Sequence, residues 1–410
     1  RPYAAPMPLD RRSMGMFSAL SAALAAGYGV LFTVVGDYRD AYGISETAVG
    51  LIIGMGFLSG FVAQVAIAPL ADRGHARKLI VIGVLVNVAG LLLMAFGGAF
   101  LPIMVGRVIS GLGIGAALPA IRRIVIIADP VNLGRNLGRL LSADVFGFAM
   151  GPAISAALVG PVGLEAPFVV VAAATAILGG FALRVDVEES SEAVTKRFAL
   201  DLLSDRTVAG AVILGAAAFL MIGAFDALWD VVHEDLGTTT WMANLGIALF
   251  AIPHIILGPT GGKLAQRVGP FRVGSAGIFV ACGFMTAYGL LPTGTWIFSV
   301  AMVHAVTDGL TIAASGVAIG MTVPEARQAG AQGVMGAAQA LVAGITAIII
   351  GGLYDQFGRA TAYIASAAGM FLFAVTALAL AAPTWRRRQY RAPVAHVAAA
   401  AFGALGDDEI

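Results

Sequence analysis

Few ionisable residues stand inside the long apolar runs of this sequence, and four of them are spaced so that they could do chemistry. His304 and Asp308 are four residues apart in "HAVTDG", and Asp226 and Asp230 are four apart in "GAFDALWD". Residues at positions i and i+4 of a helix lie on one face. Histidine changes its charge near neutral pH, and a carboxyl group in an apolar environment keeps its proton more readily than one in water. Either pair could therefore take up and release a proton, although a static hydrogen bond between His304 and Asp308 is the simpler alternative.

One arginine, Arg107, lies in the apolar stretch "GRVISGLGIGAALP" (106–119). A permanent cation in hydrocarbon costs from about 3 to more than 10 kcal/mol, so a residue of this kind is usually functional. We expect Arg107 to face an internal cavity and to pair with a carboxylate or with an anionic group of a substrate. The alternative is a structural arginine that backbone carbonyl groups satisfy.

Other polar or aromatic residues within the apolar runs could line the same cavity. They are Tyr28, Phe32, Gln64, Asn87, Trp229, His254 and Gln339. Asp37, at the end of the first run, is a further candidate for substrate or proton coupling, but it also fits an ordinary loop acid. Trp229 equally fits the aromatic belt at a membrane surface, and His254 fits a histidine that is satisfied in the core.

The composition indicates which elements must position these residues. The chain has 410 residues, of which 59% are hydrophobic and 12% charged, whereas soluble domains carry about 25% charged residues. A helix that crosses a bilayer needs about 20 largely apolar residues. Runs of this kind predict twelve membrane-spanning helices, at 14–36, 47–70, 79–98, 100–121, 139–160, 166–183, 207–231, 241–264, 273–291, 295–320, 330–353 and 361–382. The predicted fold class is therefore an all-α polytopic membrane protein.

The basic residues are distributed unevenly between the two sides of such a membrane protein. Of the 25 Lys and Arg residues, all except Arg39, Arg107 and Arg359 fall on the side of the two termini. The positive-inside rule then places both termini in the cytoplasm of a protein of the inner (plasma) membrane. The net charge of +1 hides this asymmetry, which reports orientation in a lipid bilayer and does not indicate nucleic-acid binding.

The sequence offers little for other chemistries. Cys282 is the single cysteine, and neither an HExxH metal pair nor a Gly-rich phosphate loop ending in Lys-Ser/Thr occurs. We therefore expect no bound metal, no cofactor, no ATP-driven step and no enzymatic activity.

The chain divides in the middle, at the polar stretch "RVDVEESSEAVTKRFALDLLSDR". The predicted units are an N-terminal six-helix half at 1–183, a cytoplasmic linker at 184–206, a C-terminal six-helix half at 207–382 and a cytoplasmic tail at 383–410. The halves echo each other, since "LADR" (70–73) follows the second span and "LAQR" (264–267) follows the eighth. Transporters built from repeated halves place the substrate site between them. Because Gln266 replaces the acid in the second copy, we expect a substitution of Gln266 to affect transport far less than a substitution of Asp72.

Three stretches carry a family resemblance. The loop "APLADRGHARK" (68–78), with Asp72, Arg73 and Arg77, is similar to a cytoplasmic loop signature written G-x-L-A-D-R-x-G-R-K. Arg107, followed four residues later by Gly111 and then by small residues, is similar to a fourth-helix motif. A fifth-helix motif associated with antiporters is matched at Gly138, Gly147, Gly151 and Pro152. With these three in the right helices and order, the chain resembles the major facilitator superfamily over essentially its whole length.

The resemblance implies a gating role for the first of these loops. Asp72 could pair with Arg73 or Arg77 to form a latch that breaks when the halves rock apart. Asp129 could complete this latch, and Asp144 could join it. The simpler alternative for the loop is an ordinary basic anchor at the membrane surface.

The resemblance and the buried carboxylates together predict a secondary active transporter with two pseudo-symmetric halves. The favoured function is a proton-coupled exporter, or antiporter, of amphipathic or drug-like small molecules that works by alternating access. The alternatives on the same fold are a transporter of lipids or lysolipids and an uptake permease for a small metabolite or anion. A receptor or an enzyme on this fold is the rival class. The resemblance also implies that the protein works as a monomer.

Overall fold

The computed structural model describes residues 10–182 and 198–382, and these are almost entirely helical. The first half contains α1 (Arg11–Tyr42), α2 (Glu46–Ala66), α3 (Ala76–Phe96), α4 (Phe100–Ala128), α5 (Leu133–Val162) and α6 (Ala166–Ala182). The second half contains α7 (Arg206–Asp235), α8 (Thr240–Val268), α9 (Pro270–Leu290), α10 (Gly294–Thr311), α11 (Ala314–Thr322) and α12 (Gln328–Leu380). Four short 3-10 helices lie between them: η1 (Ala68–Arg73), η2 (Pro130–Asn132), η3 (Leu200–Ser204) and η4 (Glu325–Arg327). The predicted tail at 383–410 and linker residues 184–197 lie outside the described residues.

Local signals set where several helices begin. The side chain of Asp10 caps α1 by accepting a hydrogen bond from the Ser13 amide at 2.7 Å, and its hydrogen bonds with Ser13 hold the pKa of Asp10 below its usual value. Asp205 caps α7 in the same way, through the amides of Thr207 and Val208. Such caps satisfy amide groups that have no partner within the helix.

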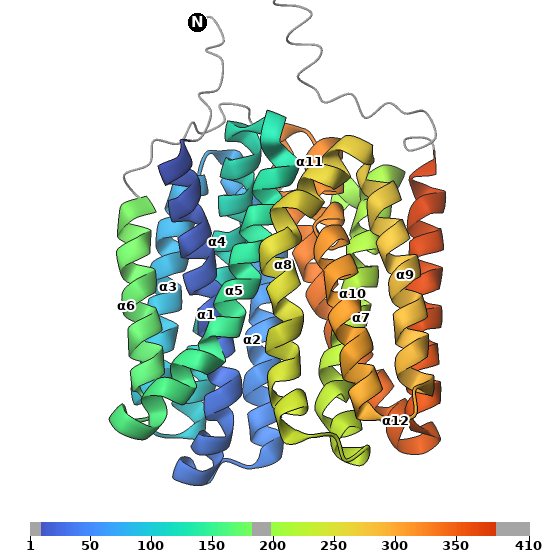
Figure 1. Cartoon of the computed structure of the whole chain (residues 1–410). Helices are drawn as coiled ribbons and strands as arrows, with labels where there is room; N and C mark the ends of the chain where they lie inside the picture. Colours follow the sequence, from blue (N-terminus) through green and yellow to red (C-terminus); the bar gives the residue numbers. More distant parts are fainter. Residues whose placement is uncertain (1–9, 183–197, 383–410) are drawn as a thin grey trace, which may run out of the picture.

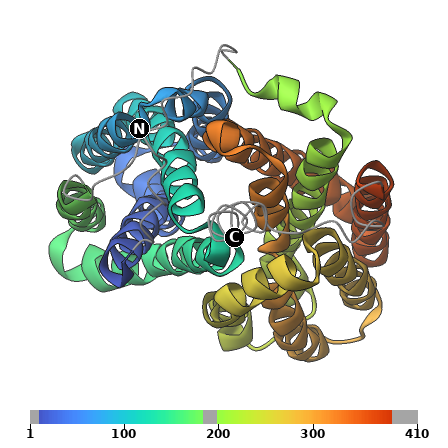
Figure 2. The same cartoon turned by 90° about the horizontal axis from the view of Figure 1, so that it is seen from above.

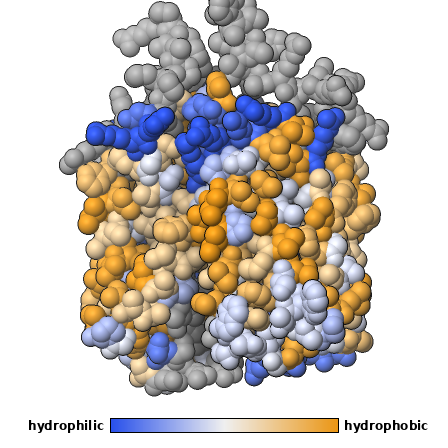
Figure 3. Space-filling view, viewed as in Figure 1, coloured by the Kyte–Doolittle hydropathy of each residue, from blue (hydrophilic) through white to orange (hydrophobic). Residues whose placement is uncertain are grey.

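The outer surface of the bundle is apolar. In the described chain, ten helical segments are long and apolar enough to cross a membrane, and α6 is a shorter apolar helix. Large apolar side chains point outward, for example Leu85, Ile177 and Ile348, which are 61%, 61% and 79% exposed. Figure 3 shows this apolar flank below a hydrophilic band at one end. Since soluble proteins rarely expose so much contiguous apolar surface, the chain is a multi-pass membrane protein, as predicted.

The helices differ from the twelve predicted spans at two places. The tenth span is two helices, α10 and α11, because Ile312 and Ala313 form a turn between them. The last two spans form the single element α12, whose backbone turns at Gly358 with a φ of 79°. Glycine adopts this conformation without the steric cost that other residues pay. Each predicted span still falls on one crossing, and the described ends of the chain, Asp10 and Ala382, lie at the same end of the bundle (Figure 1).

The bundle consists of two groups of helices that lie side by side. Figure 2 shows α1–α6 in one group and α7–α12 in the other. The described Lys and Arg residues, apart from Arg39, Arg107 and Arg359, lie at or near the end that carries Asp10 and the four 3-10 helices. We call this the basic end.

The two halves touch closely at the basic end, where α5 packs against α8. A Cβ atom on Gly134 would lie 2.1 Å from the Gly262 carbonyl oxygen, and one on Gly138 would lie 2.1 Å from that of Gly258. Glycine is therefore required for the backbones to approach this closely. In the described part of the chain, the hydrogen bonds between halves extend from this end no further than Ser142 of α5. The structure is thus closed at the basic end.

Candidate functional site

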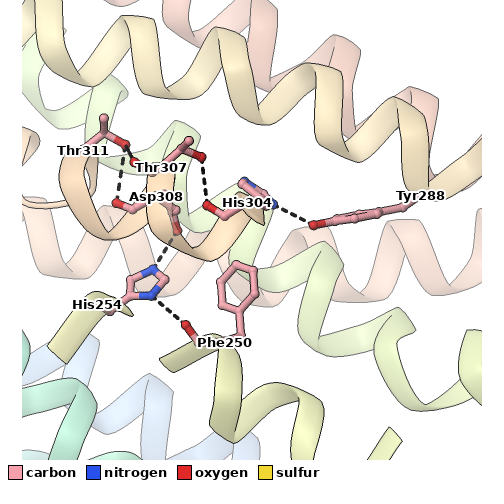
Figure 4. A network of polar contacts seen from close by, with 7 residues as sticks. All are labelled: Phe250, His254, Tyr288, His304, Thr307, Asp308 and Thr311. Atoms are coloured by element: carbon pink, nitrogen blue, oxygen red, sulfur yellow. Dashed lines mark hydrogen bonds and ion pairs between the residues drawn. The ribbon is translucent and has the colours of Figure 1, made fainter. Parts of the chain in front are cut away.

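A buried histidine–aspartate contact joins two helices of the second half. Nε2 of His254 on α8 lies 2.8 Å from Oδ2 of Asp308 on α10, and each residue is 5% exposed. Nδ1 of His254 lies 3.0 Å from the carbonyl oxygen of Phe250 (Figure 4). Both ring nitrogens of the histidine therefore have a partner, which fixes the orientation of the ring.

The prediction that His304 pairs with Asp308 is wrong, because Asp308 contacts His254 and not His304. His304 instead bonds through Nδ1 to the hydroxyl of Tyr288 on α9, at 2.9 Å (Figure 4). Asp308 sits beside Gly309, where a Cβ atom would lie 2.8 Å from the Pro253 carbonyl oxygen. Because α8 and α10 lie close together there, His254 is within hydrogen-bond distance of Asp308. Tyr288 gave no signal in the sequence, since an aromatic residue in an apolar run is ordinary core composition.

The His254–Asp308 pair is connected to the contact between the halves. The hydroxyl of Ser142 on α5 donates a hydrogen bond to the backbone carbonyl oxygen of His254, at 3.1 Å. Both groups are buried. The residue that holds Asp308 therefore also contacts the first half of the protein.

Two acids lie on α7, the most enclosed of the membrane-crossing helices. Asp226 and Asp230 are exposed and share one face, and no described cation forms an ion pair with them. An acid that faced lipid would be costly, so their exposure points to the space between the halves.

Trp229, between these two acids, lines neither the cavity nor the membrane surface. It is 1% exposed, and its Nε1 donates a hydrogen bond to the carbonyl oxygen of Ala243 at 2.9 Å. A Cβ atom on Gly246 would lie 2.1 Å from the Trp229 ring, so the ring packs directly on the backbone of α8.

Arg107 is fully buried in the first half, between α1, α2 and α4. Its side chain is 0% exposed, and Nε, Nη1 and Nη2 all lack a hydrogen-bond partner among the described residues. The guanidinium carbon lies 4.1 Å from the centre of the Tyr28 ring. The expected carboxylate partner is therefore missing from the described side chains, and backbone carbonyl groups do not replace it.

The remaining candidates for the cavity are scattered. Asn87 is buried and donates to the Ser110 hydroxyl at 2.8 Å. Gln64 lies at the contact between α2 and α12, where a Cβ atom on Gly336 would be 2.1 Å from its side-chain oxygen. Gln339 faces α7. Asp37 is exposed near the end of α1, and the side chain of Phe32 lies outside the described residues.

At the basic end, Asp72 bridges the two halves. Its Oδ1 accepts hydrogen bonds from Nε of Arg123 on α4 and from the amide of Ala329 on α12, both at 2.9 Å, while Oδ2 accepts from the Gly330 amide at 2.7 Å. Asp72 and Arg123 are each 1% exposed. A carboxylate at the first amides of a helix is favoured by the helix dipole, so this contact stabilises the closed basic end.

The partners predicted for this latch were different. The partner is Arg123 on α4, one of the basic residues on the side of the two termini, rather than Arg73 or Arg77. Asp129 instead accepts hydrogen bonds from Asn132 and Asn136 around η2. Asp144 pairs within the first half, with Arg122 at 3.1 Å and with Ser21. The short turn η1 buries Asp72 against α4, which loop spacing alone does not reveal.

The second copy of the loop also bridges the halves. Oε1 of Gln266 accepts a hydrogen bond from the Gly134 amide at the start of α5, at 2.8 Å. Its Nε2 donates to the carbonyl oxygens of Pro130 and Val131 at 3.3 and 3.2 Å. Gln266 and Asp72 therefore occupy equivalent positions, since each links one half to the other. The smaller effect expected for a substitution of Gln266 depends only on its lack of charge.

The fifth-helix motif serves two different contacts. Gly138 faces α8 of the other half, whereas Gly147 and Gly151 face α1 within the first half. A Cβ atom on Gly147 would lie 1.9 Å from the Ala22 carbonyl oxygen, and one on Gly151 would lie 2.4 Å from the Gly29 carbonyl carbon. Pro152 lies inside α5.

Two halves that meet at one end, with buried ionisable groups along the helices between them, define a membrane transporter built from repeats. The chain belongs to the major facilitator superfamily, whose model matches residues 16–228 and 211–407. Members of this family are transporters rather than enzymes. In the described chain, no group of three or more His, Cys, Asp or Glu residues could hold a metal ion.

Known relatives agree with this placement. An uncharacterised MFS-type transporter of Methanocaldococcus jannaschii, MJ1560, is 25% identical over 364 residues, which are 83% of this chain and 91% of the relative. The class C tetracycline resistance protein of Escherichia coli is 23% identical over 378 residues, which are 88% and 95% of the two chains. Among solved structures, the transporter FucP in its outward conformation matches with a TM-score of 0.73 at 15% identity, over 90% of this chain and 98% of FucP. The last likeness concerns the fold alone.

Proposed function

We propose that the protein is a proton-coupled exporter of amphipathic or drug-like small molecules that works by alternating access as a monomer. The observation that carries the proposal is the buried His254–Asp308 pair, whose histidine also contacts Ser142 of the other half. The similarity to a tetracycline resistance protein supports the substrate class. The matches to the fifth-helix motif support antiport.

The pair supplies a place for one exchangeable proton. A neutral imidazole beside a carboxylate carries one negative charge, and uptake of a proton makes the pair neutral overall. Moving charge through a low-dielectric interior is costly, so the halves rearrange more readily when the pair holds the proton. Asp226 and Asp230 face the space between the halves and form a second acidic site, which a proton or a basic substrate group could occupy.

The latch at Asp72 determines which side of the protein is closed. In the closed state its carboxylate holds the first amides of α12 and the guanidinium of Arg123. Opening the basic end exchanges these contacts for water. With the basic end in the cytoplasm, closure leaves the cavity accessible from outside, where the proton enters.

Transport in proteoliposomes tests this function, with tetracycline as the probe. We expect counterflow of tetracycline in the absence of a gradient and uphill movement when a pH gradient is imposed. Asp308→Asn should lose the gradient-driven movement while counterflow persists, because the exchangeable proton is lost but the substrate site remains. Asp355→Asn, at an exposed acid on α12, is the matched control and should behave like the unmodified protein.

Two results would contradict the proposal. Counterflow without any response to the pH gradient would rule out proton coupling. Absence of tetracycline counterflow, in protein that is folded and inserted, would rule out this substrate class.

A further inference from the structure

Arg107 has no hydrogen-bond acceptor among the described residues, whereas three other arginines each pair with an acid. Arg122 pairs with Asp144, Arg123 with Asp72, and Arg327 with Asp201. Arg107 is the most deeply buried of these four arginines, yet all three of its side-chain nitrogens lack a partner among the described residues. A buried ion without a counter-charge or hydrogen bonds is strongly disfavoured, so its position requires an explanation.

The described groups that surround Arg107 supply neither a counter-charge nor a hydrogen-bond acceptor for its side chain. The Tyr28 ring covers one face of the guanidinium at 4.1 Å, which is a favourable cation–π contact but offers no hydrogen-bond acceptor to the N–H groups. The backbone of α2 lies close to the side chain, since a Cβ atom on Gly56 would be 2.2 Å from Nε. The guanidinium is therefore held in place, with its donors unused.

The Tyr28 ring, which covers the guanidinium, is held in place by contacts with α2. Its hydroxyl donates a hydrogen bond to the Gly56 carbonyl oxygen at 3.1 Å, and its ring stacks on Phe57 at 5.5 Å. Tyr28 is half-buried and Phe57 is 42% exposed, so these rings lead from Arg107 toward the surface. Rotation of the Tyr28 side chain would break one neutral hydrogen bond and the cation–π contact. It would uncover the guanidinium.

The chemistry of the missing partner follows from the guanidinium. Its planar set of donors matches the two oxygens of a carboxylate. One unpaired positive charge neutralises one negative charge, whereas a dianion would leave a net charge in the apolar interior. The rings of Tyr28 and Phe57 offer apolar contact to the body of a ligand.

We propose that Arg107 binds the carboxylate of a transported amphipathic monoanion or zwitterion, and that Tyr28 is the cover that turns aside to admit it. This inference rests on the proposed function, since it names a chemical group that the cargo carries. It replaces the expected carboxylate of the protein with one from the substrate.

Binding to the purified full-length protein in phosphatidylcholine nanodiscs tests the proposal, with 2-naphthoate and its neutral analogue 2-naphthamide as probes. We expect calorimetry to show 2-naphthoate binding about tenfold to a hundredfold more tightly, as for hydrogen bonds to a charged group. Arg107→Gln should abolish this preference. Arg122→Gln, the same change of charge on the same helix, should retain it.

Two further variants separate the parts of the site. Arg107→Lys keeps the charge but loses the planar set of donors, so the preference should fall to an intermediate value. Tyr28→Phe keeps the ring and loses the hydrogen bond to Gly56, so 2-naphthoate should bind severalfold more tightly. This variant leaves Arg107 in place and keeps the proposal testable if Arg107→Gln does not fold.

Several outcomes would overturn the inference. Equal binding of the two probes to the unmodified protein would do so, as would a preference that survives Arg107→Gln. Loss of the preference in excess chloride would assign the site to small inorganic ions, and its loss in nanodiscs containing phosphatidylglycerol would assign it to lipid headgroups. Failure of 2-naphthoate binding with intact gradient-driven tetracycline movement would sink this inference alone, whereas the reverse pattern would sink the proposed function.

Discussion

At the scale of single residues, the buried charged groups of the two halves have different kinds of partner. The acid in the second half, Asp308, has a titratable partner in His254. The cation in the first half, Arg107, has an aromatic cover and no acceptor among the described residues. The two proposals together assign a proton site to one half and a site for an anionic group to the other, so that cargo and proton need not compete for one residue.

The Asp72 latch leads to a prediction about charge. Asp72→Asn leaves Arg123 buried without its counter-charge, and breaking such a pair costs up to about 3–5 kcal/mol. The double variant Asp72→Asn with Arg123→Gln should recover part of this loss, because no unpaired charge then remains. Gln266→Asn shortens a neutral side chain whose hydrogen bonds contribute about 0.5–1.5 kcal/mol each, so it should open the basic end less than Asp72→Asn does.

Spin-label distances across the basic end measure these changes. Labels at His75 and Val268, both exposed and in different halves, should move apart most in Asp72→Asn, in a Cys282→Ser background that removes the native cysteine. Equal opening by Asp72→Asn and Gln266→Asn would show that the charge of Asp72 has no special role.

At the scale of elements, α5 packs closely against one helix of each half. Its face at Gly147 and Gly151 packs on α1 of the same half, whereas its face at Gly138 packs on α8 of the other half. If the halves rock as rigid bodies, the first contact is permanent and the second exists only while the basic end is closed.

Single methyl groups should distinguish these contacts. Gly138→Ala crowds the closed state alone, so it should open the basic end with little change in Tm. Gly151→Ala crowds α1 in every state and should lower the stability by about 1–3 kcal/mol, as overpacking does, with little effect on the distance across the basic end. The same spin labels and thermal melting measure both. Opening caused by Gly151→Ala at an unchanged Tm would contradict this division.

The sequence predicted the elements better than their contacts, for a physical reason. A run of about 20 apolar residues has few alternatives to a membrane helix, so the crossings were evident. The turn at Ile312 and Ala313 was not, because it changes no residue composition. Arg107 and Asp308 were identified because charge is rare in such runs. Their neighbours Tyr28 and His254 were among the candidates, but their roles depend on how helices distant in sequence pack together.

At the scale of the whole molecule, the basic end combines two properties. It carries nearly all of the described cations, and it is the end at which the two halves are closed. The orientation of the protein therefore decides which side of the membrane the closed gate faces. The assignment of export depends on this orientation.

Fusions to reporter proteins test the orientation directly. With the basic end in the cytoplasm, green fluorescent protein fused after Asp408 or inserted after Ser190 should fluoresce, and alkaline phosphatase at these sites should be inactive. Alkaline phosphatase inserted after Pro292 should be active, since Pro292 is exposed between α9 and α10 at the opposite end. The neighbouring Gly294 is a poor insertion site, because it is buried against Thr238. Phosphatase activity after Asp408, or its absence after Pro292 in inserted protein, would reverse the orientation, and the gate seen here would then close the outer side.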